Sequence, residues 1–136
     1  MIVVALLLNV ALLVVASLHL MWALGVWFPI RDEERLVAMV VGLRGETRMP
    51  GPIPCALVVA GLTIAAGLPW IADGPIKQAG LIVAATVFLV RGILPFRPFW
   101  RKLTPQEPFA TLDRKLYGPL CLVFSAGFAL IAWKGI

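Results

Sequence analysis

At 136 residues, the chain has room for one domain. Hydrophobic residues make up 61% of it and charged residues only 14%, well below the roughly 25% that is usual in soluble domains. The formal net charge of +5 could indicate nucleic-acid binding, but the basic residues fall in two clusters between apolar runs rather than in one continuous patch. The composition therefore predicts an integral membrane protein in a lipid bilayer and argues against a nucleic-acid partner.

Four apolar runs are candidates for membrane-spanning helices, since about 20 residues at a rise of 1.5 Å cross the roughly 30 Å hydrocarbon layer. They cover residues 2–28, 54–72, 79–94 and 117–133. Only helices or closed barrels satisfy the backbone in lipid, and no alternation of period two indicates a barrel. We therefore expect an all-α four-helix transmembrane bundle that forms a single domain. The third and fourth runs are short, which predicts a thin or distorted apolar belt there.

The basic residues are distributed unevenly between the two sides of this bundle. Those on or beside the two long loops are Arg31, Arg35, Arg44, Arg48, Arg91, Arg97, Arg101, Lys102, Arg114 and Lys115. Only Lys77 and Lys134 lie on the opposite side. Because cytoplasmic loops of membrane proteins are enriched in lysine and arginine, we expect both long loops to be cytoplasmic and both termini to be outside.

Both long loops carry signs of local order. In the first, Asp32-Glu33-Glu34 precedes the apolar stretch 36–41, which predicts a short helix with an acidic start, ended by Gly42. Six apolar residues cannot span a membrane, so this helix should lie in the interface or tuck under the bundle. The second loop, 95–108, intersperses prolines with aromatic residues and predicts an ordered cap on the membrane surface.

Small residues recur at spacings that let helices approach closely in lipid. The pairs are Ala56 and Ala60, Gly61 and Ala65, and Gly80 and Ala84. Such pairs serve mostly in internal packing, and the alternative is a face that docks on another membrane protein. The two halves of the sequence show no convincing internal repeat, which weakens the case for a transporter.

In this orientation, polar residues within or beside the helices gather in the inner half of the bundle. The candidate ligand-binding or structural cluster comprises His19, Trp22, Arg91, Asp113, Arg114 and Tyr117. A titratable side chain inside an apolar run is costly to bury and is therefore a functional candidate by default. Cys55 and Cys121 lie at the same depth on the reducing side, where a structural disulfide is not expected.

Each of these residues also has a structural explanation. His19 can be a neutral imidazole hydrogen-bonded to a neighbouring helix, or it can contact a ligand or a proton. Trp22, one turn away on the same face, can pack in the core or anchor at the interface. Arg91 can extend to the headgroups or pair with Asp113, because a charge at membrane depth needs a counter-charge. Asp113 can instead cap the fourth helix, and Tyr117 can be an interfacial residue.

No catalytic or metal-binding signature accompanies these residues. The single histidine, the two separated cysteines and the carboxylates show no ligand spacing typical of a metal site. There is no Ser/His/Asp order, no phosphate-binding glycine loop and no pair of intramembrane carboxylates. We therefore expect no metal, no cofactor and no catalytic residue, and we favour a non-enzymatic protein without excluding an enzyme.

Two motifs carry a family resemblance: His19-Leu20-Met21-Trp22-Ala23-Leu24-Gly25 and Phe109-Ala110-x-x-Asp113-Arg114-x-x-Tyr117-Gly118-Pro119-Leu120-Cys121. Together with Gly42-x-Arg44-Gly45…Met49-Pro50, they resemble DUF3995, a family of small bacterial four-helix membrane proteins of unknown function. The family pattern has a glycine in place of Val26 and a serine in place of Gly118, which are mild departures. The resemblance covers most of the chain and implies the fold and a bacterial inner-membrane location, but no reaction.

Two functions remain open. The first is a non-enzymatic accessory or interaction subunit of a larger membrane complex, whose partners are other membrane protein subunits. The alternative is a membrane-embedded binding protein or enzyme for an amphipathic small molecule. In that case His19 and Tyr117 would contact the ligand or exchange protons, and Arg91 or Arg114 would hold an anionic group. This alternative predicts a pocket beside His19 that opens towards the cytoplasmic face.

Overall fold

The computed structural model describes residues 1–136 and contains helices and loops without strands. Four helical segments are long and apolar enough to cross a membrane: Ile2–Ala23, Pro52–Trp70, Pro75–Phe96 and Phe109–Lys134. They confirm the all-α architecture with four such helices that the sequence predicts.

The spanning segments are built from several elements. The first is α1 (Ile2–Ala23), and the second is α3 (Pro52–Gly67) extended by the 3-10 turn η1 (Leu68–Trp70). The third is α4 (Pro75–Ile93) followed by η2 (Leu94–Phe96). The fourth is continuous through α6 (Phe109–Leu112), the π-helical turn η3 (Asp113–Tyr117) and α7 (Gly118–Lys134). Two short helices, α2 (Glu33–Val40) and α5 (Pro98–Leu103), lie in the long loops.

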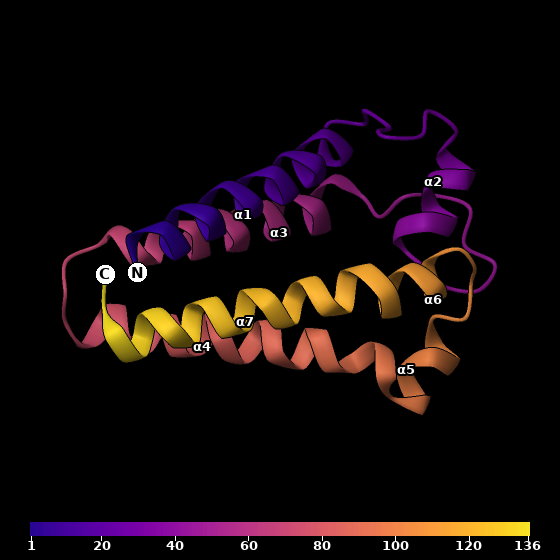
Figure 1. Ribbon diagram of the computed structural model, residues 1–136. Helices are drawn as coiled ribbons and strands as arrows, with labels where there is room; N and C mark the ends of the chain where they lie inside the picture. Colours follow the sequence, from indigo (N-terminus) through magenta and orange to yellow (C-terminus); the bar gives the residue numbers. More distant parts are fainter.

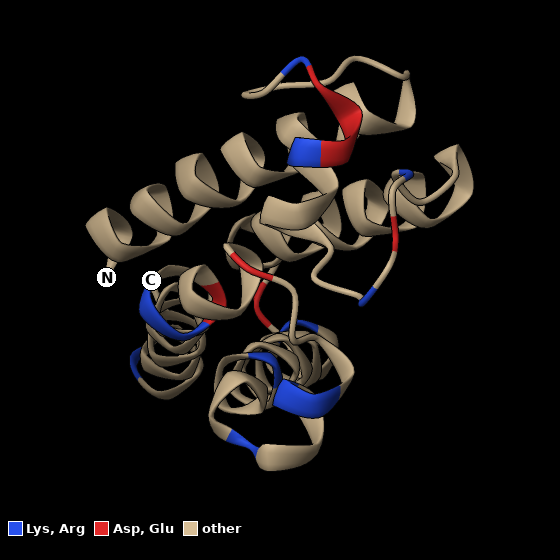
Figure 2. Ribbon diagram, turned by 90° about the vertical axis from the view of Figure 1, so that its right-hand side faces the viewer, with Lys and Arg blue, Asp and Glu red and all other residues tan.

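The spanning helices form two pairs, α1 with α3 and α4 with α7 (Figure 1). Both termini lie at one end of the bundle, and α2, α5 and α6 gather at the other, which we call the cap end. Figure 2 looks onto the cap end and shows lysine and arginine positions on its loops and short helices. The sequence shows no repeat, but the two halves have the same order of elements. In each half, a spanning helix is followed by a loop with a short helix, which we call a cap, and then by a second spanning helix.

Interhelical hydrogen bonds reinforce both pairs. Asn9 Nδ2 donates to the carbonyl oxygen of Ala66 at 3.0 Å and joins α1 to α3. Ser125 Oγ donates to the carbonyl oxygen of Ala85 at 2.7 Å and joins α7 to α4. Because lipid gives no hydrophobic force between helices, such bonds and close packing hold them together.

The apolar core is divided along the bundle. All four spanning helices share one core, made of Ala5, Leu8, Leu12, Ala65, Ala66, Leu81, Ala84, Phe124, Phe128 and Ile131. A second core belongs to the first pair and its cap: Trp22, Leu36, Val37, Met49 and Cys55. Leu36 and Val37 of α2 are 0% and 1% exposed. The short helix expected in the first loop is therefore present and tucked under the bundle.

The first helix ends at Ala23, five residues before the expected end at Phe28. Gly25 adopts a φ of 77°, and Val26 N donates to the carbonyl oxygen of Met21 at 2.8 Å. Gly25 N donates to Trp22 O at 3.1 Å, which completes a Schellman cap. The apolar residues 24–28 continue the hydrophobic run but not the helix, so hydrophobicity alone misplaces the boundary.

The other three spanning helices begin earlier than expected, and the third and fourth are also longer. The second begins at Pro52 rather than at residue 54, and the third begins at Pro75 rather than at residue 79. The fourth begins at Phe109 rather than at Tyr117, because its charged residues interrupt the apolar run but not the helix. The third and fourth segments contain 22 and 26 residues, more than the short apolar runs within them. The thin or distorted apolar belt stays a prediction.

The π-helical turn has a local cause. Pro119 has no backbone N–H, and its ring would clash with the carbonyl of Lys115 in a regular α-helix. The wider turn avoids this clash, and Gly118 N instead donates to the carbonyl oxygen of Asp113, five residues earlier.

Candidate functional site

The six candidate residues do not form one cluster. Arg91 and Asp113 lie in a charged network between α4 and the fourth spanning segment. Tyr117 belongs to the contact between the two caps. His19 and Trp22 lie on the other side of the molecule, beside α2 and α3. Arg114 lines a separate surface groove.

Arg91 pairs with Asp113. Arg91 Nη2 donates to Asp113 Oδ1 at 2.7 Å, and Trp100 Nε1 donates to Asp113 Oδ2 at 2.8 Å. Asp113 is 2% exposed, so its carboxylate is buried with both oxygens occupied. The Arg91 guanidinium carbon also lies 5.5 Å from the centre of the Trp100 ring, within cation–π range. Arg91 therefore has an internal partner instead of extending to the headgroups, and Asp113 makes no helix-capping bond.

Two glycines allow this pair to form. A Cβ on Gly118 would lie 3.2 Å from the carbonyl oxygen of Gly92, and a Cβ on Gly92 would lie 3.0 Å from the carbonyl oxygen of Gly118. The backbones of α4 and α7 thus approach closely beside Arg91 and Asp113. Close approach of this kind requires residues without a side chain.

Tyr117 joins the two halves of the molecule. Its hydroxyl donates to the carbonyl oxygen of Met39 in α2 at 3.0 Å, and its ring lies 5.8 Å from that of Phe109. Phe109 in turn packs directly against Gly42, and Gln106 N donates to the carbonyl oxygen of Gly42 at 3.1 Å. We call this contact the seam. It brings together residues of two motifs that are far apart in the sequence.

His19 bonds within its own helix rather than to a neighbouring one. Its Nδ1 lies 2.9 Å from the carbonyl oxygen of Val15, and its ring lies 4.7 Å from that of Trp22. Trp22 Nε1 donates to the carbonyl oxygen of Phe28 at 2.8 Å. A carbonyl oxygen can only accept, so His19 Nδ1 is the donor in this bond, and in that tautomer Nε2 is an acceptor.

A small pocket lies beside His19. Its volume is about 140 Å³, and it is lined by His19, Trp22, Val40, Val41, Met49, Pro50, Pro54, Cys55 and Val58. Ligand sites for drug-sized molecules measure roughly 300–1,000 Å³, so this pocket suits only a small group or part of a longer ligand.

The structure adds two residues that the sequence does not single out. Trp100 is one of the aromatic residues of the second loop, which the sequence predicts only as an ordered cap, yet it binds the buried carboxylate of Asp113. The available signal was its indole N–H, which needs an acceptor wherever the ring is buried. Gly42 was expected only to end α2, yet it is also the contact point for Phe109. No group of three or more histidine, cysteine or carboxylate side chains is placed to hold a metal ion.

Comparison with known proteins gives the family but no activity. No curated protein and no solved structure matches the chain. The family described as "Protein of unknown function (DUF3995)" matches residues 2–128, nearly the whole chain. The matched range includes the three motifs that carry the family resemblance. The chain therefore belongs to the DUF3995 family and is a small membrane protein of a family of unknown function.

Proposed function

We propose that this protein is a non-enzymatic interaction subunit of a larger membrane assembly, with its cap end on the cytoplasmic side of a bacterial inner membrane. The charge distribution supports the orientation, since only Lys77 and Lys134 of the twelve lysines and arginines lie towards the other end. The observation that carries the docking role is the outward face of α3.

The outward face of α3 combines small and large apolar residues. Ala56 and Ala60, one turn apart, are exposed. They are flanked by Ile53, Leu57 and Ile64, which are 71%, 68% and 67% exposed. A pair of small residues between larger ones lets a second helix approach closely in lipid. This face makes no use of its small residues within the chain, so it is suited to a helix of a partner subunit.

The other small-residue pairs differ from Ala56 and Ala60. Ala65 and Ala84 are 8% exposed and belong to the shared core, and a Cβ on Gly80 would meet Leu68. Internal packing thus accounts for Ala65 and for the pair Gly80 and Ala84. Gly61 is exposed and a Cβ there would meet nothing within 4 Å, so internal packing does not account for it, as it does not for Ala56 and Ala60. This contrast supports the interpretation that the small residues on the outward face of α3 serve in docking.

The bonding of the polar residues supports a non-enzymatic role. Both carboxylate oxygens of Asp113, the hydroxyl of Tyr117 and the indole N–H of Trp22 are engaged in bonds that hold the caps. Groups used in this way are not free to bind or activate a substrate. These bonds support a structural reason for the presence of these residues in the family motifs.

The test is native mass spectrometry of the protein extracted gently from its own membrane. We expect co-purifying subunits with the wild type and their loss with Ala60→Leu, because a leucine there prevents close helix approach. The matched control is Ala129→Leu, the same change at an exposed alanine of α7, which should retain the subunits. A wild-type chain that appears as a bare monomer contradicts the proposal.

A second candidate function is supported by the pocket beside His19. An amphipathic small molecule with a hydrogen-bond donor could place that donor on His19 Nε2 and extend its apolar part along the exposed residues outside. The same mass spectra would then show a stoichiometric small molecule on the wild type. Both His19→Ala and Val58→Phe, which keeps the histidine but fills the pocket, should remove it. A molecule that remains on both variants would rule out this site.

A further inference from the structure

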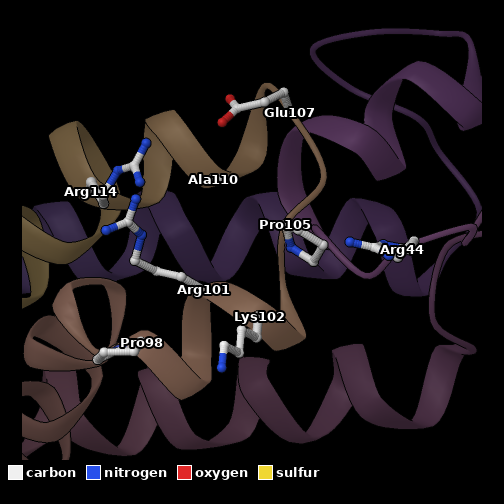
Figure 3. A pocket seen from close by; sticks show the side chains of 8 residues that line it. All are labelled: Arg44, Pro98, Arg101, Lys102, Pro105, Glu107, Ala110 and Arg114. Atoms are coloured by element: carbon white, nitrogen blue, oxygen red, sulfur yellow. The ribbon is translucent and has the colours of Figure 1, made fainter.

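A groove on the cap end concentrates positive charge. Its volume is about 530 Å³, and it is lined by Arg44, Pro98, Arg101, Lys102, Pro105, Glu107, Ala110 and Arg114 (Figure 3). Four of these residues are cations, and they come from three segments: the loop after α2, the helix α5 and the π-helical turn. Glu107 is the only acidic residue of the groove. Folding thus gathers cations that lie far apart in the sequence.

The four cations have no counter-charge bonded to them. The two ion pairs of the chain are Lys77–Asp73 and Arg91–Asp113, and neither includes a residue of the groove. Glu107 Oε2 instead accepts a hydrogen bond from Thr111 N at 3.2 Å. Like charges that are brought together repel one another, and the repulsion is larger beside a protein surface than in bulk water. An anion bound between the cations would remove this repulsion.

The orientation of two arginines indicates which anion. In Figure 3 the guanidinium groups of Arg101 and Arg114 turn towards one another, and Arg44 reaches into the groove from the first loop. A guanidinium presents a planar fork of donors that matches two oxygens of a phosphate. A phosphate group has enough oxygens to bind two such forks at once. Pro98 and Pro105 stiffen the backbone at the groove, so the cations are held on a fixed frame.

We propose that this groove binds a phosphate-bearing anion, through the facing guanidinium groups of Arg101 and Arg114, with Arg44 and Lys102 as the other cations that line it. The proposal concerns a different surface from the outward face of α3 and does not depend on the subunit role. The phosphate can belong to a phospholipid headgroup or to a soluble phosphate ester, because both present the same charged oxygens.

The surroundings of the groove contain apolar surface as well. Phe99 and Leu103 of α5, the helix that also carries Arg101 and Lys102, are 61% and 56% exposed, and Phe96 in the preceding turn is 52% exposed. Acyl chains of a lipid can lie along these side chains while its phosphate enters the groove. A soluble ester would use the groove alone, and this difference makes the two sources separable.

The experiment measures binding to the full-length protein in a non-ionic detergent. The probes are dihexanoylphosphatidic acid, glycerol 3-phosphate and decanoate, which is an anionic amphiphile without phosphate. The variants are Arg101→Gln and Arg114→Gln. The control is Arg35→Gln, which removes an exposed charge at the cap end outside the groove. Far-UV circular dichroism and the unfolding temperature establish that each variant is folded.

We expect dihexanoylphosphatidic acid to bind the wild type, with a dissociation constant about tenfold higher in each groove variant and within about twofold in the control. Binding of glycerol 3-phosphate with similar affinity would support a soluble ester, and its failure to bind would support a lipid headgroup. The proposal is overturned if neither phosphate probe binds at millimolar concentration. It is also overturned if decanoate binds equally well, or if Arg35→Gln weakens binding as much as the groove variants.

Discussion

The half of the chain formed by α1, α2 and α3 and the half formed by α4 to α7 each contain a carboxylate that bonds to a group distant in the sequence and fixes a cap. In the first half, Glu33 Oε1 accepts a hydrogen bond from the backbone N–H of Met49 at 3.0 Å. The buried apolar side chains of α2 also hold this cap against the first helix pair. In the second half, Asp113 binds the side chains of Arg91 and Trp100. Glu33 therefore bonds to a neutral group, whereas Asp113 neutralises a charge inside a spanning segment.

This difference shows what each half needs from its carboxylate. A neutral amide can still accept a hydrogen bond from Met49 N, so the first cap requires an acceptor but not a charge. The second cap requires the charge itself, because a guanidinium at membrane depth is costly when it is left unpaired. The seam then joins two caps that are held by different interactions, and the predictions below test the seam and each cap.

The largest effect is expected at the seam, with Gly42→Ala. Gly42 has a φ of 78°, and a Cβ there would overlap the ring of Phe109, which is 4% exposed and has no room to move. The left-handed backbone costs about 1–2 kcal/mol, and overpacking adds about 1–3 kcal/mol. We expect a loss of about 3 kcal/mol in unfolding free energy, measured in mixed detergent micelles.

The control for this variant is Gly45→Ala. Gly45 has a similar φ of 75°, but a Cβ there would meet nothing within 4 Å. It should cost only about 1 kcal/mol, the backbone part of the effect. Equal losses at the two glycines would show that Phe109 does not hold the caps together.

The contrast between the two carboxylates is tested directly by Asp113→Asn and Glu33→Gln. Each change keeps the shape of the side chain and removes its charge. Breaking a buried ion pair costs about 3–5 kcal/mol, and because the side chain of Arg91 is 32% exposed we expect about 2–3 kcal/mol for Asp113→Asn. Glu33→Gln should cost less than about 1 kcal/mol. Similar losses of unfolding free energy in the two variants would mean that both caps depend on the charge of their carboxylate, which would contradict the difference proposed between the two halves.

A smaller effect is expected for Tyr117→Phe, which removes the hydroxyl bonded to Met39 and keeps the ring beside Phe109. One such hydrogen bond contributes about 1 kcal/mol. The unfolding temperature should therefore fall moderately, and proteolysis within loop 97–108 should become faster. Thr86→Val serves as the control, since its hydroxyl bonds only within its own helix and its loss should leave both measurements unchanged.

The smallest effect concerns pH at the start of the fourth spanning segment. Hydrogen bonding from Thr111, together with the positive charge of Arg114, holds the pKa of Glu107 below its ordinary value of 4.5. A carboxylate whose pKa is lowered by folding stabilises the folded state above its ordinary pKa, and this contribution is lost as the pH falls through the lowered value. Exchange of the Thr111 amide hydrogen should therefore show an extra acceleration below about pH 4.5, beyond the intrinsic pH dependence. Glu107→Gln should lack that extra step, and a step that persists in the variant would assign it to another group.

Much of the fold follows from the sequence, because hydrophobic run length and proline positions largely determine where spanning helices lie. The short helix α2 was also predictable, since Asp32 caps it and Gly42 ends it. The helix boundaries were harder to predict. Gly25 stops the first helix inside an apolar run, and the fourth helix continues through Asp113, which pairs with Arg91, and through the charged residues that follow it. Hydrophobicity carries no information about either effect.

The candidate site was predictable only in part. The need for a counter-charge near Arg91 points to Asp113, and the two do pair. Depth in the membrane, however, says nothing about position around the bundle, so His19 and Asp113 were grouped although they lie on different helix pairs. The basic groove was likewise hidden, because Arg44 and Arg114 are brought together by the packing of two caps.

The π-helical turn has a consequence for the phase of the fourth spanning segment. Asp113 and Gly118 are five residues apart and both buried, an arrangement that a regular α-helix would spoil by turning them about 140° from one another. The π-helical turn contains one residue more than an α-helical turn. This extra residue lets the buried side of the cap and the buried side of the apolar core face the same way along one continuous helix. Deleting one residue between Asp113 and Gly118 would therefore keep the helix but rotate one part by about 100° relative to the other. Changes of length in this turn should consequently be far less tolerated than changes of residue.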